Sequence, residues 1–282
     1  MSIINKFLTL NNFIDQKNFY QLICCNKELG YIHKHIVEIL ISSNLPVELV
    51  NKKIIFKGKR LKELNLVFNN VSEILLEKKI IKKLTGEKFP CTDFLGKKEY
   101  FYIDRATVEF LGIKGYGVHL TAYMIVKNKL YLWIPIRSKN KRVEPNKYDN
   151  TVAGGISSRE TVYQALMREA KEEANISKKL IKQAKSVGTI SYNWRNKKYS
   201  LRRDTLFLFD LEVDKKFIPY CLDGEVANFK LLSWEDVYEK ISKTNDFKKN
   251  CALVIANFLI RRGLLTTNNE PSYEKICRAM NL

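Results

Sequence analysis

The sequence predicts an α/β protein, and three features of its apolar pattern support this prediction. Several segments after residue 113 alternate apolar and polar residues, which is the pattern of half-buried strands. Helical patterns lie between and after these segments, as expected for helices on both faces of a mixed sheet. The first part of the chain mixes short strand and helix patterns, which indicates a smaller α+β unit. We therefore expect residues 1–112 to form an N-terminal domain, residues 113–265 the main α/β domain and residues 266–282 a C-terminal tail.

The expected N-terminal domain contains no motif with a chemical role. Residues 30–32 follow a turn and are expected to form a short strand, and residues 54–56 another. Residues 72–84 show helical periodicity. The apolar stripe of that expected helix consists of Ile74, Leu75, Ile80, Ile81 and Leu84.

The main domain begins with a predicted β-hairpin. Residues 116–126 and 130–137 both alternate, and the turn at Lys127–Lys129 is short. One face of the first strand is expected to bear Val118, Leu120, Ala122 and Met124. The other expected elements are an irregular segment at 138–151, strands at 186–194, 205–213 and 227–232, and helices from about 233 and over 250–261.

Bulk composition sets bounds on the class of protein. The chain has 282 residues, 45% of them hydrophobic, which is ordinary for a protein with a buried core. Its formal net charge of +19 suits nucleic acid, anionic lipid or a polyphosphate substrate. The Lys and Arg residues are scattered and interleaved with Asn, so we interpret most of this charge as surface composition. Dedicated nucleic-acid binding is not favoured, although the basic charge does not exclude it.

Other features of the sequence point to a cytoplasmic protein that does not enter a membrane. No apolar run approaches the length of a membrane span. The N-terminus lacks the basic start and long apolar core of a signal peptide. The six cysteines show no Cys-x-x-Cys pair and no zinc spacing with histidine, so we expect buried structural thiols in a reducing compartment.

The most informative segment runs from Gly154 to Ile176. It contains three carboxylates, Glu169, Glu172 and Glu173, within five residues, and helical geometry places them on one side of a helix. Like charges this close repel one another and raise one another's pKa. A divalent cation removes that repulsion. A ligand set made only of oxygen atoms suits Mg²⁺ or Mn²⁺ rather than zinc or copper.

The two ends of this helix are also predicted from the sequence. Ser157 and Glu160 have the spacing of a capping box, in which each side chain bonds the backbone amide of the other residue. Gly154 and Gly155 before them are expected to form a tight loop that exposes backbone groups to a ligand. At the other end, Asn175 is expected to take the left-handed conformation that ends many helices.

The spacing of this segment resembles the Nudix box, Gly-x5-Glu-x7-Arg-Glu-U-x-Glu-Glu-x-Gly-U, where U is aliphatic. The match departs at Asn175, where the family has Gly, and at the small Ala170. The resemblance implies a Nudix α/β/α sandwich with a mixed sheet, and hydrolysis of a diphosphate linked to another group. It also implies that Gly154, Gly155, Glu160 and Arg168 are structural members of the box. The same resemblance makes Glu169, Glu172 and Glu173 the catalytic metal ligands, for Mg²⁺ with Mn²⁺ as an alternative.

Residues outside the box are candidates for the rest of the site. Glu225, in the segment Asp223–Glu225, is the best candidate for a catalytic base or an extra ligand, with an acidic turn as the alternative. Arg137, Arg202 and Arg203 are candidates for binding phosphates, or they are surface charges. His119 is either a substrate-binding residue or a satisfied histidine of the core. Four aromatic residues could stack on a substrate ring or belong to the core: Tyr116, Tyr148, Tyr192 and Trp194.

Several further blocks resemble the thiamine-pyrophosphokinase-related Nudix subfamily, in which an N-terminal domain of unknown function precedes the Nudix domain. The resemblance covers about residues 15 to 265. The blocks that match are residues 103–106, 115–120, 137–139, 149–155, 223–226 and 250–254. This resemblance implies hydrolysis of thiamine diphosphate, or of its damaged oxo and oxy analogues, to the monophosphate. It does not imply kinase activity, because the sequence has no Gly-x4-Gly-Lys-Ser/Thr loop.

Alternative functions stay open at this point. One is a Nudix hydrolase that acts on nucleotides, such as ADP-ribose, a dinucleotide or a capped RNA end. Another is a non-catalytic binding module that keeps the Nudix fold, although the complete set of three carboxylates argues against it. A prenyl diphosphate isomerase is less favoured, because no paired Cys and Glu occur in the expected blocks. The partner is expected to be a small diphosphate, and a homodimer is left open.

Overall fold

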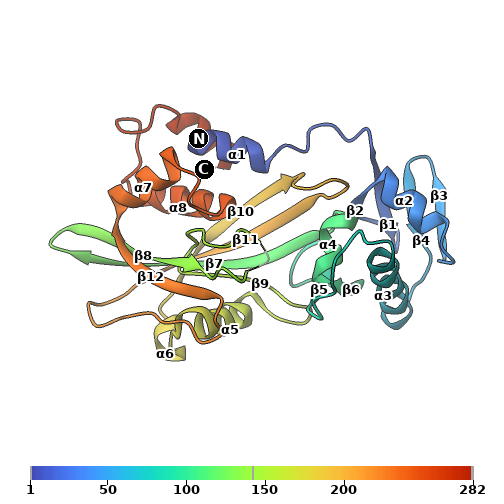
Figure 1. Ribbon diagram of the computed structural model, residues 1–282, viewed down its shortest axis with the longest axis horizontal. Coiled ribbons are helices and arrows are strands. Elements are labelled where there is room, and N and C mark those ends of the chain that lie inside the picture. The colour runs from blue at the N-terminus through green and yellow to red at the C-terminus, as the bar shows by residue number, and fades with distance from the viewer. Residues whose placement is uncertain (1, 142, 281–282) are drawn as a thin grey trace.

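The computed structural model describes residues 2–141 and 143–280 and shows two bodies side by side (Figure 1). The N-terminal body contains a four-stranded sheet in the order β2-β1-β4-β3 and a separate two-stranded sheet, β5-β6. Its elements are β1 (Phe19–Cys24), β2 (Lys27–His33), α2 (Lys34–Ile41), β3 (Val47–Val50), β4 (Lys53–Phe56), α3 (Leu61–Glu77), β5 (Lys88–Cys91), β6 (Phe101–Asp104) and α4 (Arg105–Leu111). This α+β content agrees with the sequence.

One expected element of the N-terminal body is misplaced. The helix predicted at residues 72–84 is instead α3, which begins at Leu61 and ends at Glu77. The chain turns at Lys79, which adopts a left-handed conformation with φ 56°. Ile81 is nevertheless buried, because the chain after the turn folds back onto the same core. The apolar periodicity after residue 77 therefore indicated residues that face the core, although these residues are not helical.

The second body is built on a six-stranded mixed sheet in the order β10-β11-β7-β8-β12, with β9 paired to β7. Strands β7 and β11 are parallel, and the other pairs are antiparallel. The elements of this body are β7 (Lys114–Val126), β8 (Lys129–Arg137), β9 (Val152–Gly155), α5 (Val162–Ala174), α6 (Lys178–Ile181), β10 (Lys185–Trp194), β11 (Arg202–Glu212), β12 (Val226–Ser233), α7 (Trp234–Lys243) and α8 (Lys249–Arg261). The predicted hairpin is confirmed as β7 and β8, and Lys127 and Asn128 at its turn both have positive φ.

Helices cover both faces of this sheet, which confirms the α/β/α sandwich. On one face, Val118, Leu120, Ala122 and Met124 of β7 pack against α5, as the alternation predicted. On the other face, Leu132 and Ile134 of β8 pack in the core that contains α8. Figure 1 shows α5 and α6 on one side of the sheet and α7 and α8 on the other.

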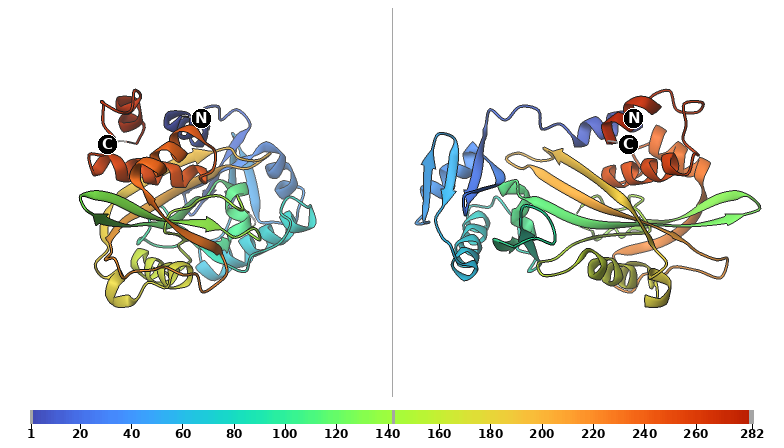
Figure 2. Two further views of the ribbon diagram at one scale, coloured as in Figure 1. Left: turned by 60° about the vertical axis from the view of Figure 1, so that its left-hand side comes forward. Right: turned by 180° about the vertical axis from the view of Figure 1, so that it is seen from behind.

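The two ends of the chain meet on the second body. Helices α1 (Ile3–Leu10) and α9 (Tyr273–Met280) contact each other, and α1 also contacts α8. Buried residues of both terminal helices belong to the core of the second body. Figure 2 shows both termini on the same side of this body. The predicted domain boundaries at residues 112 and 265 stay a proposal. Residues 3–10 and 273–280 lie outside the predicted main domain, yet they pack into its core, so contacts cross both boundaries.

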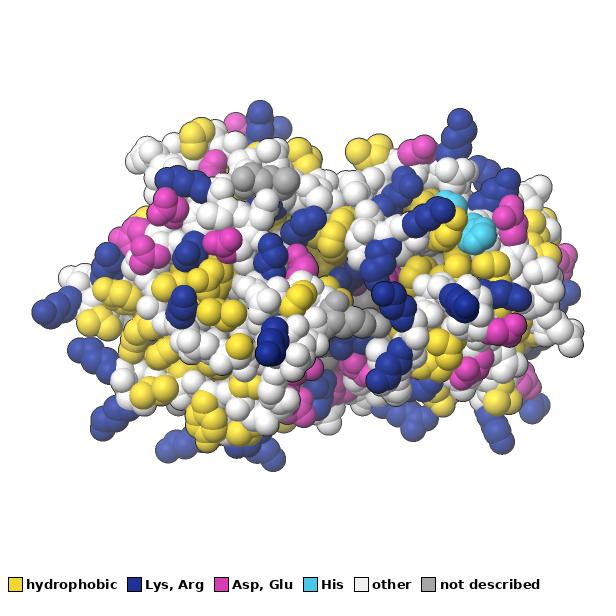
Figure 3. Space-filling model, viewed as in Figure 1, with side chains coloured by type: hydrophobic (Ala, Val, Ile, Leu, Met, Phe, Trp, Pro, Cys, Tyr) yellow, Lys and Arg dark blue, Asp and Glu magenta, His cyan; other side chains and the backbone are white. Residues whose placement is uncertain are grey.

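Surface charge and cysteine placement follow the composition. On the face seen in Figure 3, Lys and Arg side chains are spread over both bodies and do not gather in one band. Cys24, Cys91 and Cys251 are buried, and Cys25, Cys221 and Cys277 are partly buried, all as free thiols. Among the described residues, no helix is both long enough and apolar enough to span a bilayer.

Candidate functional site

The segment from β9 to α5 shapes the base of the site, and its helix begins later than predicted. The capping residue is Thr161, whose side chain accepts from the amide of Gln164 and forms a capping box with it. The expected box at Ser157 and Glu160 is therefore not the helix start. Its predicted contact does exist as a turn, because the Ser157 amide donates to the Glu160 carboxylate at 3.1 Å. Arg159, with φ 66°, separates this turn from the helix.

Gly154 and Gly155 lie in strand β9, not in the tight loop that was predicted. Their need for glycine comes from close approach. A Cβ atom at Gly154 would lie 1.9 Å from Cδ of Glu169, and one at Gly155 would lie 2.6 Å from Cζ of Phe89. The missing side chain at Gly154 thus leaves the space that the Glu169 carboxylate occupies.

The N-terminal body holds the loop between β9 and α5. The Ser158 amide donates to the Lys88 carbonyl at 2.7 Å. Glu99 accepts from the Ser158 hydroxyl at 2.6 Å and from the Arg159 amide at 2.8 Å. The position of this loop therefore depends on residues outside the main domain.

Arg168 braces the helix against its loop, as the resemblance implied. It donates through Nε to Glu160 at 2.9 Å and through Nη2 to the Gly155 carbonyl at 3.0 Å. Its Nη1 lies 2.6 Å from Glu169 and 3.4 Å from Glu172. The guanidinium therefore links the loop, the strand and two carboxylates of α5 through charge-assisted hydrogen bonds.

The three carboxylates of α5 differ in their surroundings. Glu169 and Glu173 are buried, and Glu172 is more exposed. Burial raises the pKa of Glu169 even though Arg168 opposes the shift. Burial, reinforced by Glu169 and Asp149, raises the pKa of Glu173 to about 8, although the Ala153 amide donates to it at 2.7 Å. Within residues 2–141 and 143–280, no group of three His, Cys, Asp or Glu side chains converges closely enough to hold a metal ion.

The end of α5 agrees with the prediction for Asn175. This residue adopts the left-handed conformation, with φ 48° and ψ 36°. The Ile176 amide then bonds the Ala170 carbonyl at 2.9 Å, which closes the last turn. The departure from Gly in the family pattern therefore keeps the helix end intact.

A first cavity, here called the carboxylate cavity, lies over the second half of α5 and has a volume of about 200 Å³. Glu225 and Asp223 both lie in its wall, so the structure brings this predicted segment to Glu169 and Glu172. Glu225 is also ion-paired with Lys141. The residues that line the cavity are Glu87, Arg105, Arg137, Lys141, Val143, Ala153, Gly154, Gly155, Arg168, Glu169, Glu172, Arg202, Asp223, Glu225 and Lys248.

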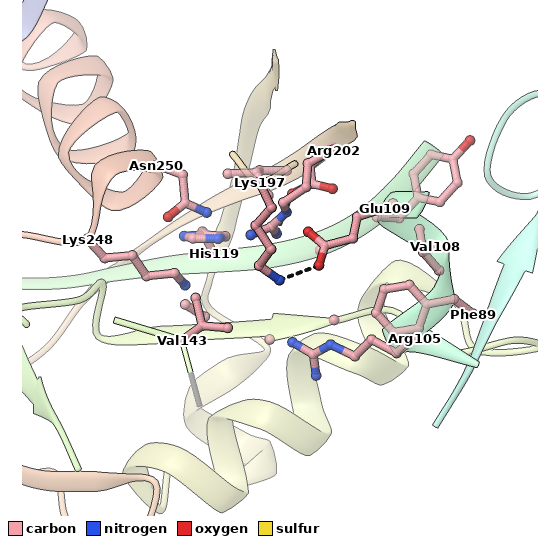
Figure 4. A pocket seen from close by; sticks show the side chains of 18 residues that line it. Phe89, Arg105, Val108, Glu109, His119, Val143, Lys197, Arg202, Lys248 and Asn250 are labelled. Atoms are coloured by element: carbon pink, nitrogen blue, oxygen red, sulfur yellow. Dashed lines mark hydrogen bonds and ion pairs between the residues drawn. The ribbon is translucent and has the colours of Figure 1, made fainter. Parts of the chain in front are cut away.

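A second cavity, here called the aromatic cavity, adjoins the first (Figure 4) and has a volume of about 130 Å³. Phe89 and Tyr116 line it, together with His119 and Asn250. Seven residues line both cavities, so the two are continuous: Arg105, Val143, Ala153, Gly154, Gly155, Arg202 and Lys248. A volume near 150 Å³ accepts a single benzene ring, so the aromatic cavity has the size of one aromatic ring.

Arg137, predicted to bind phosphate, is used mainly to hold the 138–151 segment. It is buried and donates to Asp149 at 2.5 Å and to the carbonyls of Val143 and Glu144. It still lines the carboxylate cavity. Burial alone would raise the pKa of Asp149, but Lys248 and Arg137 outweigh it and lower that pKa to about 2. The pair is therefore a buried ion pair that fixes the wall of the cavity.

The two adjacent arginines, Arg202 and Arg203, have different places. Arg202 lines both cavities and donates to Asp204 at 2.6 Å. Arg203 is not among the residues that line either cavity, so the structure does not bring it together with the other predicted site residues. It donates to the Gly112 carbonyl at 3.2 Å and lies over the ring of Tyr31 at 4.8 Å. Successive side chains of a strand point to opposite faces, so only one of the two could reach the site.

His119 is a buried residue in the wall of the aromatic cavity. Its Nδ1 lies 2.8 Å from the Asn150 Oδ1 atom, and because a carbonyl oxygen only accepts, Nδ1 donates. Burial and the charge of Lys248 lower the pKa of His119 to about 4, so the ring is neutral near pH 7. A neutral ring with its proton on Nδ1 has an unprotonated Nε2, which can accept a hydrogen bond from a ligand.

Of the four candidate aromatic residues, one lines a cavity and three belong to the core or pack against it. Tyr116 lines the aromatic cavity. Tyr192 belongs to the core, where its hydroxyl donates to Asp204 at 2.6 Å. Tyr148 and Trp194 pack against the same core and are not among the residues lining either cavity.

Sequence reasoning missed several residues that line the cavities, above all Arg105, Glu109, Lys141, Lys197 and Lys248. Arg105 and Glu109 come from α4 of the N-terminal body. Lys197 lies 2.5 Å from Glu109 (Figure 4). For Arg105 a signal existed, because it lies in the block at 103–106 that matched the subfamily. For the others, a single charged residue in a Lys-rich chain gives no usable signal.

Comparisons with known proteins agree with this geometry. The family model described as "NUDIX domain" matches residues 118–252. Nudix hydrolase 24, chloroplastic, of Arabidopsis thaliana is 37% identical over 211 residues, which is 75% of this chain and 57% of that protein. Nudix hydrolase 20, chloroplastic, of the same plant is 39% identical, over 70% of this chain and 52% of that protein. The uncharacterized protein YJR142W of Saccharomyces cerevisiae is 32% identical, over 77% of this chain and 67% of that protein. The chain thus spans little more than half the length of the two plant relatives.

Proposed function

Because this chain belongs to the Nudix hydrolase family, we propose that it hydrolyses the phosphoanhydride bond of a diphosphate joined to an organic group. One observation supports this proposal most strongly. The carboxylate cavity and the aromatic cavity are continuous and share Arg105, Arg202 and Lys248. A diphosphate held by these cations would place its organic group in the ring-sized cavity and its scissile bond beside α5.

The donor set on α5 has the chemistry of a divalent-metal site, although its carboxylates do not converge on one point in this structure and would have to move together to bind an ion. Glu169, Glu172 and Glu173 offer only oxygen ligands, which suit Mg²⁺ or Mn²⁺. Burial of two of these carboxylates raises their pKa, as expected where negative charge lacks enough compensating positive charge. We propose these three residues as the metal ligands. Bound there, a divalent cation would neutralise phosphate charge and lower the pKa of a water.

The protein's own residues would then position the reacting groups. Arg202 and Lys248 lie where both cavities meet and would bind the phosphates. Glu225, in the wall opposite α5, is the proposed base that takes a proton from the attacking water. Its ion pair with Lys141 keeps it at the rim of the cavity.

For the organic group, we propose thiamine diphosphate or its damaged oxo and oxy analogues. The products would be the monophosphate and phosphate. The sequence blocks that resemble the thiamine-pyrophosphokinase-related subfamily support this choice, and so does an aromatic cavity with room for one ring. His119 is proposed to accept a hydrogen bond from that ring through Nε2, since its Nδ1 is already bonded to Asn150.

A hydrolysis screen tests both levels of the proposal. Purified full-length protein with Mg²⁺ or Mn²⁺ is offered thiamine diphosphate, its oxo and oxy analogues, ADP-ribose, dinucleoside polyphosphates and capped RNA. We expect metal-stimulated release of phosphate, fastest from the thiamine analogues. Faster turnover of a nucleotide would overturn the proposed thiamine substrate but would still support the proposed hydrolysis of a phosphoanhydride. If no compound in the panel is hydrolysed, the alternative of a binding module with a Nudix fold is favoured.

A further inference from the structure

We propose that Arg105, a residue of the N-terminal body, binds a phosphate of the substrate at the junction of the carboxylate and aromatic cavities. This inference rests on the proposed hydrolysis of a diphosphate. It assigns part of the phosphate binding to the N-terminal body, in which the sequence shows no motif with a chemical role.

The position of Arg105 is the first support. It lines both cavities, and Figure 4 shows its guanidinium extending into the space below the Lys197–Glu109 ion pair in that view. In the carboxylate cavity it lines the same space as Glu169 and Glu172, two of the carboxylates that are proposed to bind metal.

The hydrogen-bonding capacity of Arg105 is the second support. Its Nη1 donates to Glu87 at 2.8 Å, and its guanidinium lies over the ring of Phe89 at 5.5 Å. Among the described residues, no further acceptor takes Nε or Nη2 of Arg105. A guanidinium held on one side, with donors left in one plane, matches the oxygens of a phosphate.

The third support is the rigid attachment of α4 to the second body. The Leu201 amide donates to the Glu109 carbonyl at 2.7 Å, and Arg203 donates to the Gly112 carbonyl at 3.2 Å. The Lys197–Glu109 ion pair adds a third link. These contacts lie at the C-terminal end of α4, so they hold the helix that begins with Arg105 against the start of β11 and the segment before it. The role found for Arg203, which was predicted to bind substrate, is thus to hold the helix that carries Arg105.

The test measures binding of methylenediphosphonate, a diphosphate mimic with a carbon bridge that cannot be hydrolysed. Titration calorimetry with Mg²⁺ compares the wild-type full chain with Arg105→Gln, Arg105→Lys and the control Arg60→Gln. Arg60 also lies in the N-terminal body, but its side chain is exposed and lines neither cavity. Loss of one charge-assisted hydrogen-bonding group typically weakens binding roughly tenfold to a hundredfold.

We expect Arg105→Gln to weaken binding by at least about tenfold and Arg105→Lys to fall between it and the wild type. Arg60→Gln should bind as the wild type does. Equal thermal midpoints would show that Arg105→Gln is folded, and partial rescue by Lys would show that the positive charge contributes to binding of the probe. Unchanged binding in Arg105→Gln, or no binding of the probe by the wild type, would overturn the proposal.

The outcome is separable from that of the proposed substrate. If thiamine diphosphate is hydrolysed and Arg105→Gln binds the probe normally, only the role of Arg105 is lost. If binding of the probe depends on Arg105 but no thiamine compound is hydrolysed, the substrate assignment fails and the role of Arg105 stands.

Discussion

The carboxylate cavity and the aromatic cavity are adjacent, yet they are built in different ways. The first takes Glu169 and Glu172 from one helix, α5, whereas its other carboxylates, Glu87, Asp223 and Glu225, come from the N-terminal body and from the segment before β12. The second is assembled from β5 and α4 of the N-terminal body, from β7 and β11 of the sheet, and from the start of α8. The difference is that the proposed metal ligands are adjacent in sequence, whereas the cavity proposed for the organic group forms only where the two bodies meet.

The two cavities also differ in how their charges are balanced. In the carboxylate cavity, Arg168 contacts Glu160, Glu169 and Glu172, and burial still raises the pKa of Glu169. In the aromatic cavity, the charged residues are paired, as in Lys197 with Glu109 and Arg202 with Asp204, and His119 is neutral. The burial penalty on carboxylates is therefore concentrated on α5, beside the first cavity, where a divalent cation is proposed to bind.

The largest expected effect is on the reaction and belongs to the carboxylate cavity. Glu173→Gln replaces a buried carboxylate with a neutral side chain that can still accept from the Ala153 amide. We expect metal-dependent phosphate release to fall by at least about a thousandfold, or about 4 kcal/mol of transition-state stabilisation. Turnover by the purified variant and its thermal midpoint are measured together. Near-normal turnover in a folded variant would remove Glu173 from the metal site.

The next effect belongs to the aromatic cavity and depends on pH. Because the pKa of folded His119 is about 4 and that of an unfolded histidine about 6.5, the unfolded chain binds the extra proton between these values. The free energy of unfolding should therefore fall as the pH drops below 6.5, by about 3 kcal/mol at pH 4. Above pH 6.5 this contribution is fully present.

Urea unfolding at pH 7.5 and pH 4 measures this loss in the wild type and in His119→Gln. The variant should lose about 3 kcal/mol less than the wild type over the same interval. His35→Gln, in the N-terminal body, serves as the matched control. An identical loss in the wild type and His119→Gln would show that His119 is not the group that titrates.

The contrast between the cavities also explains what the sequence could predict. The hairpin β7–β8, the order of later strands and the left-handed Asn175 depend on local patterns, and all were predicted. The structural role of Arg168 was implied by the resemblance to the Nudix box, and its contacts to the loop, to β9 and to α5 agree with it. Gly154 was correctly singled out but for the wrong reason, since only the packed structure shows Glu169 filling the space of its missing side chain.

Other site residues were placed differently from the prediction or were not noticed in the sequence. Their positions share a physical cause, because they depend on contacts between segments that are distant in the sequence. Successive side chains of a strand point to opposite faces, so Arg203 points away from the site that Arg202 lines. A shift of one residue in the register of the strand would exchange the places of the two arginines. Arg137 was predicted from its position at a strand end, but its guanidinium is bonded to a loop whose path the sequence does not specify. Arg105 and Glu109 reach the site only because the N-terminal body docks against β11.

A smaller effect is expected for Gly154→Ala, at the wall between the two cavities. The added Cβ would lie 1.9 Å from Cδ of Glu169, so the carboxylate or the strand must shift. Overpacking of this kind costs about 2 kcal/mol, and we expect hydrolysis to fall together with the free energy of unfolding. A Gly154→Ala variant with full activity would show that Glu169 tolerates displacement.

The smallest effect tests whether the link between the two bodies matters for the aromatic cavity. Lys197 is half exposed, so its ion pair with Glu109 is screened by solvent, and a double-mutant cycle should give a coupling below about 1 kcal/mol. The cycle uses Glu109→Gln, Lys197→Met and the double variant, with stability and KM for the best substrate measured for each. Because both residues line the aromatic cavity and lie away from α5, KM should change more than kcat. A change confined to kcat would mean that the N-terminal body acts on the reaction itself, and the division of labour between the two cavities would then be wrong.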